Sequence, residues 1–347
     1  MIIPIIIFIV SLVFLLKGSD YLIKASSSIA KKLGISEFVI GLTLVALGTS
    51  IPELATSVIA SLKHESGIIL GNVIGSNIAN IGLVLGLTAA IILVKTRQEM
   101  LKRDGYMLIF ITFLFYIFIL NLYISRLEAM IFLVIYIVYM FYLLQEKPGK
   151  KEYHFGHFLT YFLKFQYITT IRSKIIANNK NKTTPYEKRK AKTAFKEGLF
   201  KDFIIVIVSG AAVVISASFL IKEAIFFANF FNVPGTIVGI SAIALGTSLP
   251  ELTVSIAAAR KKLGNIAVGN IIGSNIANLL LVVGVSSLMS PLIVLKQTLL
   301  YLAPFMVIMT ILLLIFIKSH WQLRRKEGII LVIVYLLFLT LIFFGII

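Results

Sequence analysis

Two glutamates stand inside long apolar stretches of this chain, in segments that are almost identical. Residues 48–54 read GTSIPEL and residues 246–252 read GTSLPEL, so Glu53 and Glu251 occupy equivalent positions. A carboxylate at the centre of a bilayer costs about 2.5–3.5 kcal/mol on the insertion scale, and such residues therefore face a partner or a pathway. Neither apolar stretch contains a Lys, Arg or His. The expected counter-charge is a bound cation.

The residues around each glutamate supply further oxygen atoms. Pro52 and Pro250 each remove a backbone N–H and disturb the preceding helical turn, so carbonyls near residues 46–49 and 244–247 are expected to turn away from the helix axis. Unwound carbonyls coordinate ions in the broken helices of secondary transporters. The expected ligands and the small residues that make room for them are Ala46, Gly48, Thr49, Ser50, Ala244, Gly246, Thr247 and Ser248.

Two further segments, 71–80 (GNVIGSNIAN) and 269–278 (GNIIGSNIAN), hold a second polar set. In each segment a serine and an asparagine lie four positions apart and share one helical face. These pairs are Ser76 with Asn80 and Ser274 with Asn278. We expect them to complete the cation site.

A simpler role is open for the same polar residues, which could cross-link helices by hydrogen bonds. It applies most strongly to Asn77 and Asn275. Small residues let membrane helices approach closely, and the glycines expected to do so are Gly71, Gly75, Gly82, Gly269 and Gly273.

All the expected ligand atoms are oxygens, from carboxylate, hydroxyl, amide and backbone carbonyl groups. Oxygen ligands select hard cations, and a flexible site with many oxygens suits Ca²⁺ better than Mg²⁺. Two glutamates supply a charge of −2, which matches one Ca²⁺ or two Na⁺.

The paired segments belong to an internal repeat. With a shift of 198 residues, positions 41–80 align with 239–278 without a gap, and 22 of these 40 positions are identical. Each half contains five apolar stretches, and an odd number makes the second half enter the membrane from the opposite side. The sequence predicts an inverted repeat, the arrangement in which transporters bind ions near the midplane.

The composition indicates a membrane protein. The chain is 59% hydrophobic, only 14% charged and has no cysteine, whereas soluble domains have about 25% charged residues. Ten stretches are long enough to span a bilayer: 2–28, 36–62, 67–94, 105–122, 127–145, 200–228, 234–259, 264–289, 292–317 and 327–346. The first lacks the basic start of a signal peptide and is expected to remain as a helix. The predicted fold is an all-α membrane protein of ten transmembrane helices in two inverted five-helix repeats, 1–145 and 200–347, joined by a basic linker, 146–199.

The net charge of +18 indicates orientation and not nucleic-acid binding, because Lys and Arg cluster in alternate loops. Cytoplasmic loops carry such an excess. We therefore expect a multi-pass plasma-membrane protein with both termini outside and the 146–201 loop in the cytoplasm, with the lipid bilayer as its surroundings and no protein partner evident.

The 146–201 segment contains fourteen Lys or Arg and four Asp or Glu. Residues 154–176 have aromatic and aliphatic side chains at near-helical spacing, which fits an interfacial amphipathic helix or a partly ordered linker. Residues 178–193 are expected to be flexible and solvated. His154 and His157 alone do not make a metal site.

At these two motifs the chain resembles the alpha repeats of the sodium/calcium exchanger family, in the cation/calcium antiporter superfamily, as a prokaryotic-type member. The resemblance implies exchange of Na⁺ for Ca²⁺ by alternating access, with no cofactor and with helices one and six sliding against the other eight. It implies that the ions bind at Ala46, Thr49, Ser50, Glu53, Ser76, Asn80, Ala244, Thr247, Ser248, Glu251, Ser274 and Asn278.

Two departures from the family bear on coupling and regulation. Some prokaryotic relatives have an aspartate where this chain has Asn80 or Asn278, and two neutral residues favour Na⁺ over H⁺ coupling. The basic linker is too short for the acidic calcium-sensing domains of large members.

Other functions remain as alternatives to Na⁺/Ca²⁺ exchange. The nearest is an exchanger of H⁺ for Ca²⁺ or of another divalent cation. A cation channel fits the inverted repeat less well, and an enzyme lacks a buried base, because all four histidines lie in predicted loops.

Overall fold

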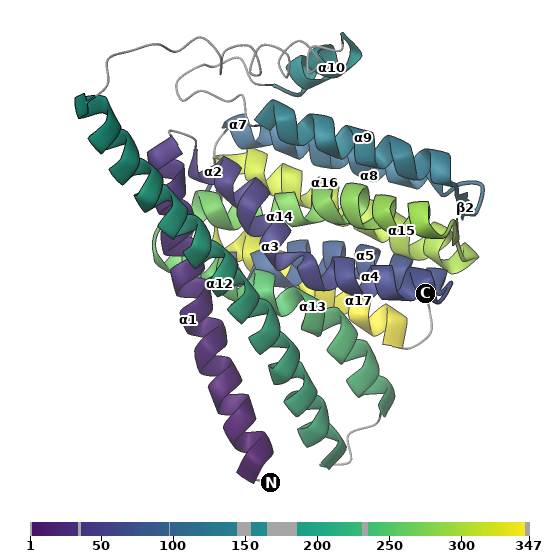
Figure 1. Ribbon diagram of the computed structural model, residues 1–347. Helices are drawn as coiled ribbons and strands as arrows, with labels where there is room; N and C mark the ends of the chain where they lie inside the picture. Colours follow the sequence, from purple (N-terminus) through teal and green to yellow (C-terminus); the bar gives the residue numbers. More distant parts are fainter. Residues whose placement is uncertain are drawn as a thin grey trace.

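The computed structural model describes residues 2–33, 36–96, 98–143, 154–164, 186–230 and 235–343, and these are mostly helical (Figure 1). The prediction of a helical membrane protein is therefore confirmed at this level. In the first half, the helices are α1 (Ile2–Leu33), α2 (Glu37–Ile40), α3 (Ala46–Thr49), α4 (Ile51–Leu62), α5 (Ser66–Ala79), α6 (Gly86–Ile91), α7 (Gln98–Met100), α8 (Tyr106–Phe118) and α9 (Arg126–Leu143). Three π-helical turns join neighbouring helices: η1 (Gly41–Val45), η2 (Asn80–Leu85) and η3 (Leu101–Gly105).

The second half has the same order of long helices. They are α12 (Tyr186–Phe230), α13 (Gly235–Arg260), α14 (Gly264–Ala277), α15 (Val283–Met289), α16 (Ala303–His320) and α17 (Arg325–Phe343). Its π-helical turns are η4 (Asn278–Val282) and η5 (Thr298–Leu302). The short helix α10 (Phe155–Leu163) lies between the halves, above the other helices in Figure 1.

Six helical segments of the described residues are long and apolar enough to cross a membrane. They are Ile3–Lys32, Ser66–Ile91, Arg126–Leu143, Gly198–Phe219, Gly264–Met289 and Thr298–His320. A seventh is the pair Glu37–Thr49 and Ile51–Leu62, which bends by 45° at Ser50. The three other stretches expected to span, 105–122, 234–259 and 327–346, correspond to α8, α13 and α17. That these helices also cross the membrane remains a prediction.

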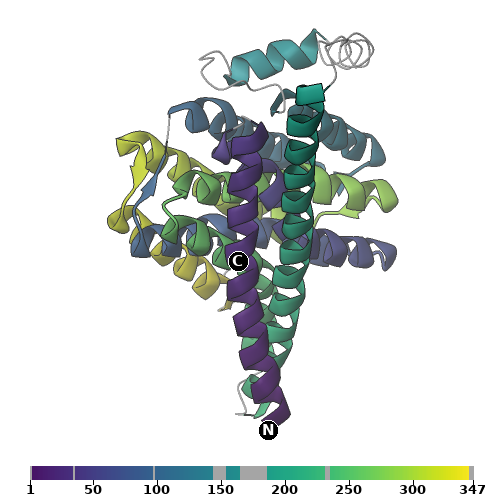
Figure 2. The ribbon, with the colours of Figure 1, turned by 60° about the vertical axis from the view of Figure 1, so that its left-hand side comes forward.

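The two longest helices, α1 and α12, lie side by side and cross most of the main bundle, including α8, α9 and α16, at a steep angle (Figures 1 and 2). Their facing residues, including Leu22, Ile29 and Val213, form an apolar cluster of their own with parts of η1, α13 and α14. The larger apolar cluster lies among the remaining helices. The core is thus divided between a crossing pair and a main bundle.

Two short strand pairs tie the halves together. Strand β1 (Val94–Lys95) pairs antiparallel with β4 (Gln322–Leu323). Strand β2 (Tyr123–Ile124) pairs antiparallel with β3 (Leu292–Ile293). In each pair, a strand of the first half meets a strand of the second.

Glycines bring α14 against the first half. A Cβ on Gly269 would lie 2.5 Å from the Phe38 carbonyl oxygen. A Cβ on Gly273 would overlap the Leu42 carbonyl oxygen. Gly82 likewise packs closely on the side chain of Tyr335. For Gly71 and Gly75 no atom of the described residues lies within 4 Å of a Cβ, so close approach at these two glycines stays a prediction.

The linker is more helical than the sequence suggested. Helix α12 begins at Tyr186, so the expected flexible stretch 178–193 is wrong for its last residues, and 178–185 lie outside the described part. Residues 187–192 (EKRKAK) are strong helix formers, and extending an existing helix is easier than nucleating one. Within 154–176, α10 is confirmed as a helix, and residues 165–176 lie outside the description.

Helix α10 places an aromatic face on the main bundle. Phe158 contacts Tyr139 and Tyr142 at ring-centroid distances of 5.7 and 5.6 Å. Phe155 lies 5.4 Å from Phe110 by the same measure. The aromatic face of α10, which was expected to contact lipid, therefore packs largely against protein.

Candidate functional site

Glu53 lies in the first turn of α4, directly after the break at Ser50. Ser50 has φ −86° and ψ 7° and separates α3 from α4, and Pro52 occupies the first turn, where its missing N–H costs no helical hydrogen bond. The Glu53 side chain is fully buried, and neither carboxylate oxygen accepts a hydrogen bond from the described residues. The break thus delivers an unpartnered carboxylate into the interior.

Glu251 occupies the equivalent position on α13 and is also fully buried. Its Oε1 accepts a hydrogen bond from the Ser274 hydroxyl at 3.4 Å, while Oε2 has no donor in the described part of the chain. The hydroxyls of Thr49 and Ser50 also lie near this carboxyl group. The first half therefore contributes to the surroundings of the glutamate of the second half.

The two glutamates share one site. Their carboxyl groups lie close enough to interact electrostatically. Neither forms an ion pair with a basic side chain among the described residues. Two neighbouring buried carboxylates repel each other, so the charged pair requires a compensating cation.

Thr49 connects the broken segment to α14. Its hydroxyl donates to the Ala46 carbonyl at 3.3 Å and to Asn270 Oδ1 at 3.1 Å, and lies 3.4 Å from the Ser274 hydroxyl. The Ala46 carbonyl also accepts the Ser50 N–H at 3.0 Å. The expectation that this carbonyl turns away from the helix is therefore wrong in this conformation, because Pro52 removes the donor for Gly48 and not for Ala46.

The break is also confined to one half. Helix α13 runs without interruption from Gly235 to Arg260, with Pro250 inside it. The expectation of an equally disturbed turn in both repeats is wrong. Ala244 and Thr247 lie on this helix, and their side chains fall outside the described part.

Four asparagines form a reciprocal network between α5 and α14. Asn80 donates to Asn275 Oδ1 at 3.0 Å, and Asn278 donates to Asn77 Oδ1 at 3.1 Å. Asn77 and Asn275 each donate to the other's backbone carbonyl, at 3.3 and 3.2 Å. Asn77 and Asn275 thus cross-link the two halves in this structure.

Asn80 and Asn278 each keep a side-chain oxygen that accepts no hydrogen bond from the described residues. Asn278 also donates to the Ser76 hydroxyl at 3.0 Å, yet its own Oδ1 has no partner among the described residues, like that of Asn80. Buried polar atoms normally find a partner. Within the described residues, the unpartnered buried oxygens include Asn72 Oδ1 and several hydroxyls elsewhere. Those that recur in both halves at the repeat spacing are Ser50 Oγ, Ser248 Oγ, both Glu53 oxygens, Glu251 Oε2, Asn80 Oδ1 and Asn278 Oδ1.

These oxygens come from three pairs of residues at the repeat spacing: Ser50 with Ser248, Glu53 with Glu251 and Asn80 with Asn278. Carboxylate, hydroxyl and amide oxygens are ligands for hard cations. The arrangement can therefore bind hard cations such as Ca²⁺ and Na⁺ without thiol or imidazole groups.

A supporting layer was missed in the sequence. Asn72 donates to the Glu53 carbonyl at 3.1 Å and to the Ser57 hydroxyl at 3.0 Å, which fixes the first turn of α4. Asn270 donates to the Ser255 hydroxyl at 3.3 Å in the other half. All four residues are identical between the halves at the 198-residue shift, and that identity was the available signal.

The π-helical turns were missed as well. Turn η2 begins at Asn80, and η4 begins at Asn278. Single π-helical turns inside α-helices occur frequently at functional sites. Both site asparagines therefore stand where the helix widens, and hydrophobic periodicity gives no sign of such a turn.

The sequence matches the family model described as "Sodium/calcium exchanger protein" in two segments, residues 3–145 and 201–344. It is 46% identical over 343 residues to the sodium/calcium exchanger MaX1 of Methanosarcina acetivorans, with 98% of each chain covered. An uncharacterized membrane protein of Methanocaldococcus jannaschii, MJ0091, is 30% identical over 330 residues, with 95% of each covered. Among solved structures, the sodium-calcium exchanger NCX_Mj soaked with 10 mM Na⁺ and zero Ca²⁺ superposes with a TM-score of 0.77 at 28% identity, with 98% of each chain covered.

Proposed function

The chain belongs to the sodium/calcium exchanger protein family, and on that premise we propose that it is a secondary antiporter that exchanges Na⁺ for Ca²⁺ across a membrane. The observation that carries the proposal is the set of buried oxygens without donors in three repeat-related pairs. Two carboxylates supply −2, so one Ca²⁺ or two Na⁺ leave the site neutral, and a third Na⁺ makes exchange electrogenic.

The ions bind between α3, α4, α5, α13 and α14 in this proposal. Glu53 and Glu251 coordinate Ca²⁺ together with hydroxyls and carbonyls beside them. The full set of ligands for Ca²⁺ and Na⁺ is Ala46, Thr49, Ser50, Glu53, Ser76, Asn80, Ala244, Thr247, Ser248, Glu251, Ser274 and Asn278. The Ala46 carbonyl and the Thr49 hydroxyl exchange their present hydrogen bonds for the ion when it binds.

The proposed architecture is ten transmembrane helices in two inverted repeats, 1–145 and 200–347, with a linker at 146–199. Three features support it. The family model matches one segment in each half. Strands β1 and β2 of the first half pair with β4 and β3 of the second half, respectively. Asn77 and Asn275 exchange equivalent hydrogen bonds, as residues beside a two-fold axis do.

Access alternates because α1 and α12 move together against the main bundle. Their separate apolar cluster supports this step, since it leaves the larger cluster of the bundle intact during sliding. The separate cluster includes the small side chains of Ala25, Ala217 and Ala258, which interlock little and so allow sliding. The alternating excess of Lys and Arg in the loops supports a plasma-membrane protein with both termini outside and the 146–201 loop in the cytoplasm.

Na⁺ rather than H⁺ or K⁺ is the coupling ion in this proposal. Asn80 and Asn278 are neutral and already bonded to Asn275 and Asn77, so neither offers a proton-binding group. Exchange of H⁺ for Ca²⁺, or of another divalent cation, is the alternative, because buried glutamates are themselves proton acceptors.

The test is ⁴⁵Ca²⁺ uptake by the purified chain in liposomes under Na⁺, K⁺ and H⁺ gradients, imposed one at a time. Uptake should follow the Na⁺ gradient with pH clamped and with K⁺ absent. A requirement for K⁺, or uptake driven by the proton gradient alone, would overturn the assignment of the coupling ion. Uptake without any counter-ion would indicate a channel.

A further inference from the structure

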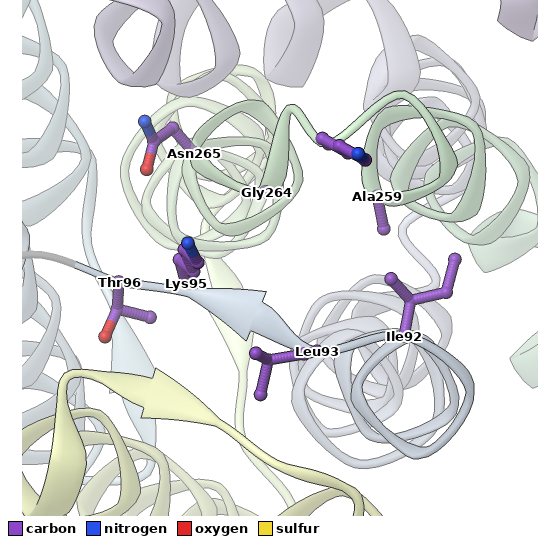
Figure 3. Close-up of a pocket in the computed structure, with 8 residues that line it drawn as sticks. Ile92, Leu93, Lys95, Thr96, Ala259, Gly264 and Asn265 are labelled. Carbon is purple, nitrogen blue, oxygen red and sulfur yellow. The ribbon is translucent and has the colours of Figure 1, made fainter.

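A cavity of about 580 Å³ lies away from the glutamates, between the end of the α6 helix and the turn that joins α13 to α14. Its lining residues are Ile92, Leu93, Lys95, Thr96, Ala259, Lys262, Gly264 and Asn265. The volume falls within the range of about 300–1,000 Å³ that small-molecule sites occupy. In the view of Figure 3, Thr96, Lys95 and Asn265 lie on one side, with Ile92 and Ala259 on the other.

Two lysines give this cavity an unbalanced positive charge. Lys95 and Lys262 form no ion pair among the described residues. Two other lysines do pair with acids: Lys261 with Asp20, and Lys32 with Asp202 at 2.7 Å. The lining of the cavity contains no acidic residue. Its charge therefore favours an anion over a cation.

Further donors converge on the same space. Gly264 and Asn265 are the first residues of α14, a helix of 14 residues, and N–H groups in a first turn have no helical acceptor. They carry the positive end of the helix dipole, which favours an anion.

We propose that this cavity binds a phosphate group, held by the ammonium groups of Lys95 and Lys262 with the Asn265 amide and the first N–H groups of α14. Two ammonium groups and a helix N-terminus match the charge and the several acceptor oxygens of phosphate. The group can belong to an anionic phospholipid or to a soluble phosphate.

The lining favours a ligand that also has an apolar part. Ile92, Leu93 and Ala259 supply aliphatic surface beside the donors, and Leu93 is 51% exposed. Lysines near a membrane surface attract anionic headgroups. Because α13 carries Glu251 and α14 carries Ser274, a ligand in this cavity ties the turn between these site helices to strand β1.

The experiment measures binding by the full chain in a neutral detergent, in two arms. One arm titrates inorganic phosphate by calorimetry, and the other titrates dioleoyl phosphatidylglycerol and counts bound lipid by native mass spectrometry. Lys95→Gln and Lys262→Gln should each weaken binding about fivefold, and the double variant more. Lys63→Gln and Lys296→Gln, exposed lysines outside the cavity, are the matched controls and should leave binding unchanged.

The arms identify the source of the phosphate. Binding of the lipid that depends on Lys95 and Lys262, without binding of inorganic phosphate, supports a headgroup site. Lysine-dependent binding of inorganic phosphate supports a site for soluble phosphates. Absence of binding in both arms, or binding that the two cavity variants and the two controls weaken equally, overturns the proposal. Thermal unfolding of each variant verifies that it remains folded, and none of these readouts requires ion transport.

Discussion

Neutralising either glutamate should abolish exchange without unfolding the protein. Glu53→Gln and Glu251→Gln keep the shape of the side chain and lower the site's charge from −2 to −1. A bound Ca²⁺ is then left with an uncompensated positive charge in a buried setting. Removing one partner of a buried pair costs about 3–5 kcal/mol, and about 1.4 kcal/mol corresponds to a tenfold change in affinity. Ca²⁺ binding should therefore weaken by roughly a hundredfold to a few thousandfold.

The structure also predicts the stability of the ion-free variants. Both carboxylates are fully buried, and three of their four oxygens have no hydrogen-bond donor among the described residues. Removing a charge from such a place relieves repulsion between the two groups, so the unfolding midpoint without Ca²⁺ or Na⁺ should stay the same or rise. The assays are Na⁺-driven ⁴⁵Ca²⁺ flux in liposomes and thermal unfolding in detergent.

Glu223→Gln is the matched control, because Glu223 is also a buried glutamate but lies on α12 outside the motifs. It should retain most of the flux, as should Glu37→Gln, whose carboxylate accepts a hydrogen bond from Ser27. The two motif variants should be alike in severity. Near-normal exchange in either motif variant would refute the assignment of its glutamate as a Ca²⁺ ligand.

Three further predictions concern orientation, packing and support of the site. In intact cells an impermeant thiol reagent should label Lys63→Cys and not Lys262→Cys. The reverse result would show that the chain has the opposite orientation in the membrane. Gly273→Ala should overpack the helix contact, lower the free energy of unfolding by about 1–3 kcal/mol and so lower the unfolding midpoint. Gly210→Ala is the control and should be neutral, because a Cβ there meets no atom of the described residues within 4 Å. Equal midpoints for the two variants would contradict the close packing of α14. Asn72→Ala should reduce Na⁺-driven flux less than the glutamate variants do, because it loosens the turn that carries one glutamate, and unchanged flux would exclude that support.

The sequence predicted which polar side chains lie buried better than it predicted their detailed geometry. Glu53, Glu251, Asn80 and Asn278 are all fully buried, and they could be singled out because polar residues recur in apolar stretches at one spacing. Their role as ion ligands stays a prediction. The local rule for proline correctly predicted the break before Glu53. It was wrong for Pro250, which lies inside the uninterrupted helix α13. Because GTS-x-PEL contains a helix break in one half and not in the other, the motif alone does not decide whether the helix is interrupted.

Features that depend on partners distant in sequence were not predictable. The partners of Asn72 and Asn270 and the π-helical turns each follow from how helices meet. The length of α12 was misjudged for a different reason, since charged residues such as Lys188 and Arg189 resemble a solvated linker in composition but favour a helix.

In the proposed function, Glu53 and Glu251 together hold a single Ca²⁺ that Na⁺ displaces. Equilibrium ⁴⁵Ca²⁺ binding to the purified chain measures this directly, with and without competing Na⁺ or K⁺, in the native protein and in the variant carrying both Glu53→Gln and Glu251→Gln. We expect one Ca²⁺ per chain, displaced by Na⁺ and not by K⁺, and no binding above background in the double variant. Binding that survives the double substitution, or that Na⁺ does not displace, would contradict this expectation.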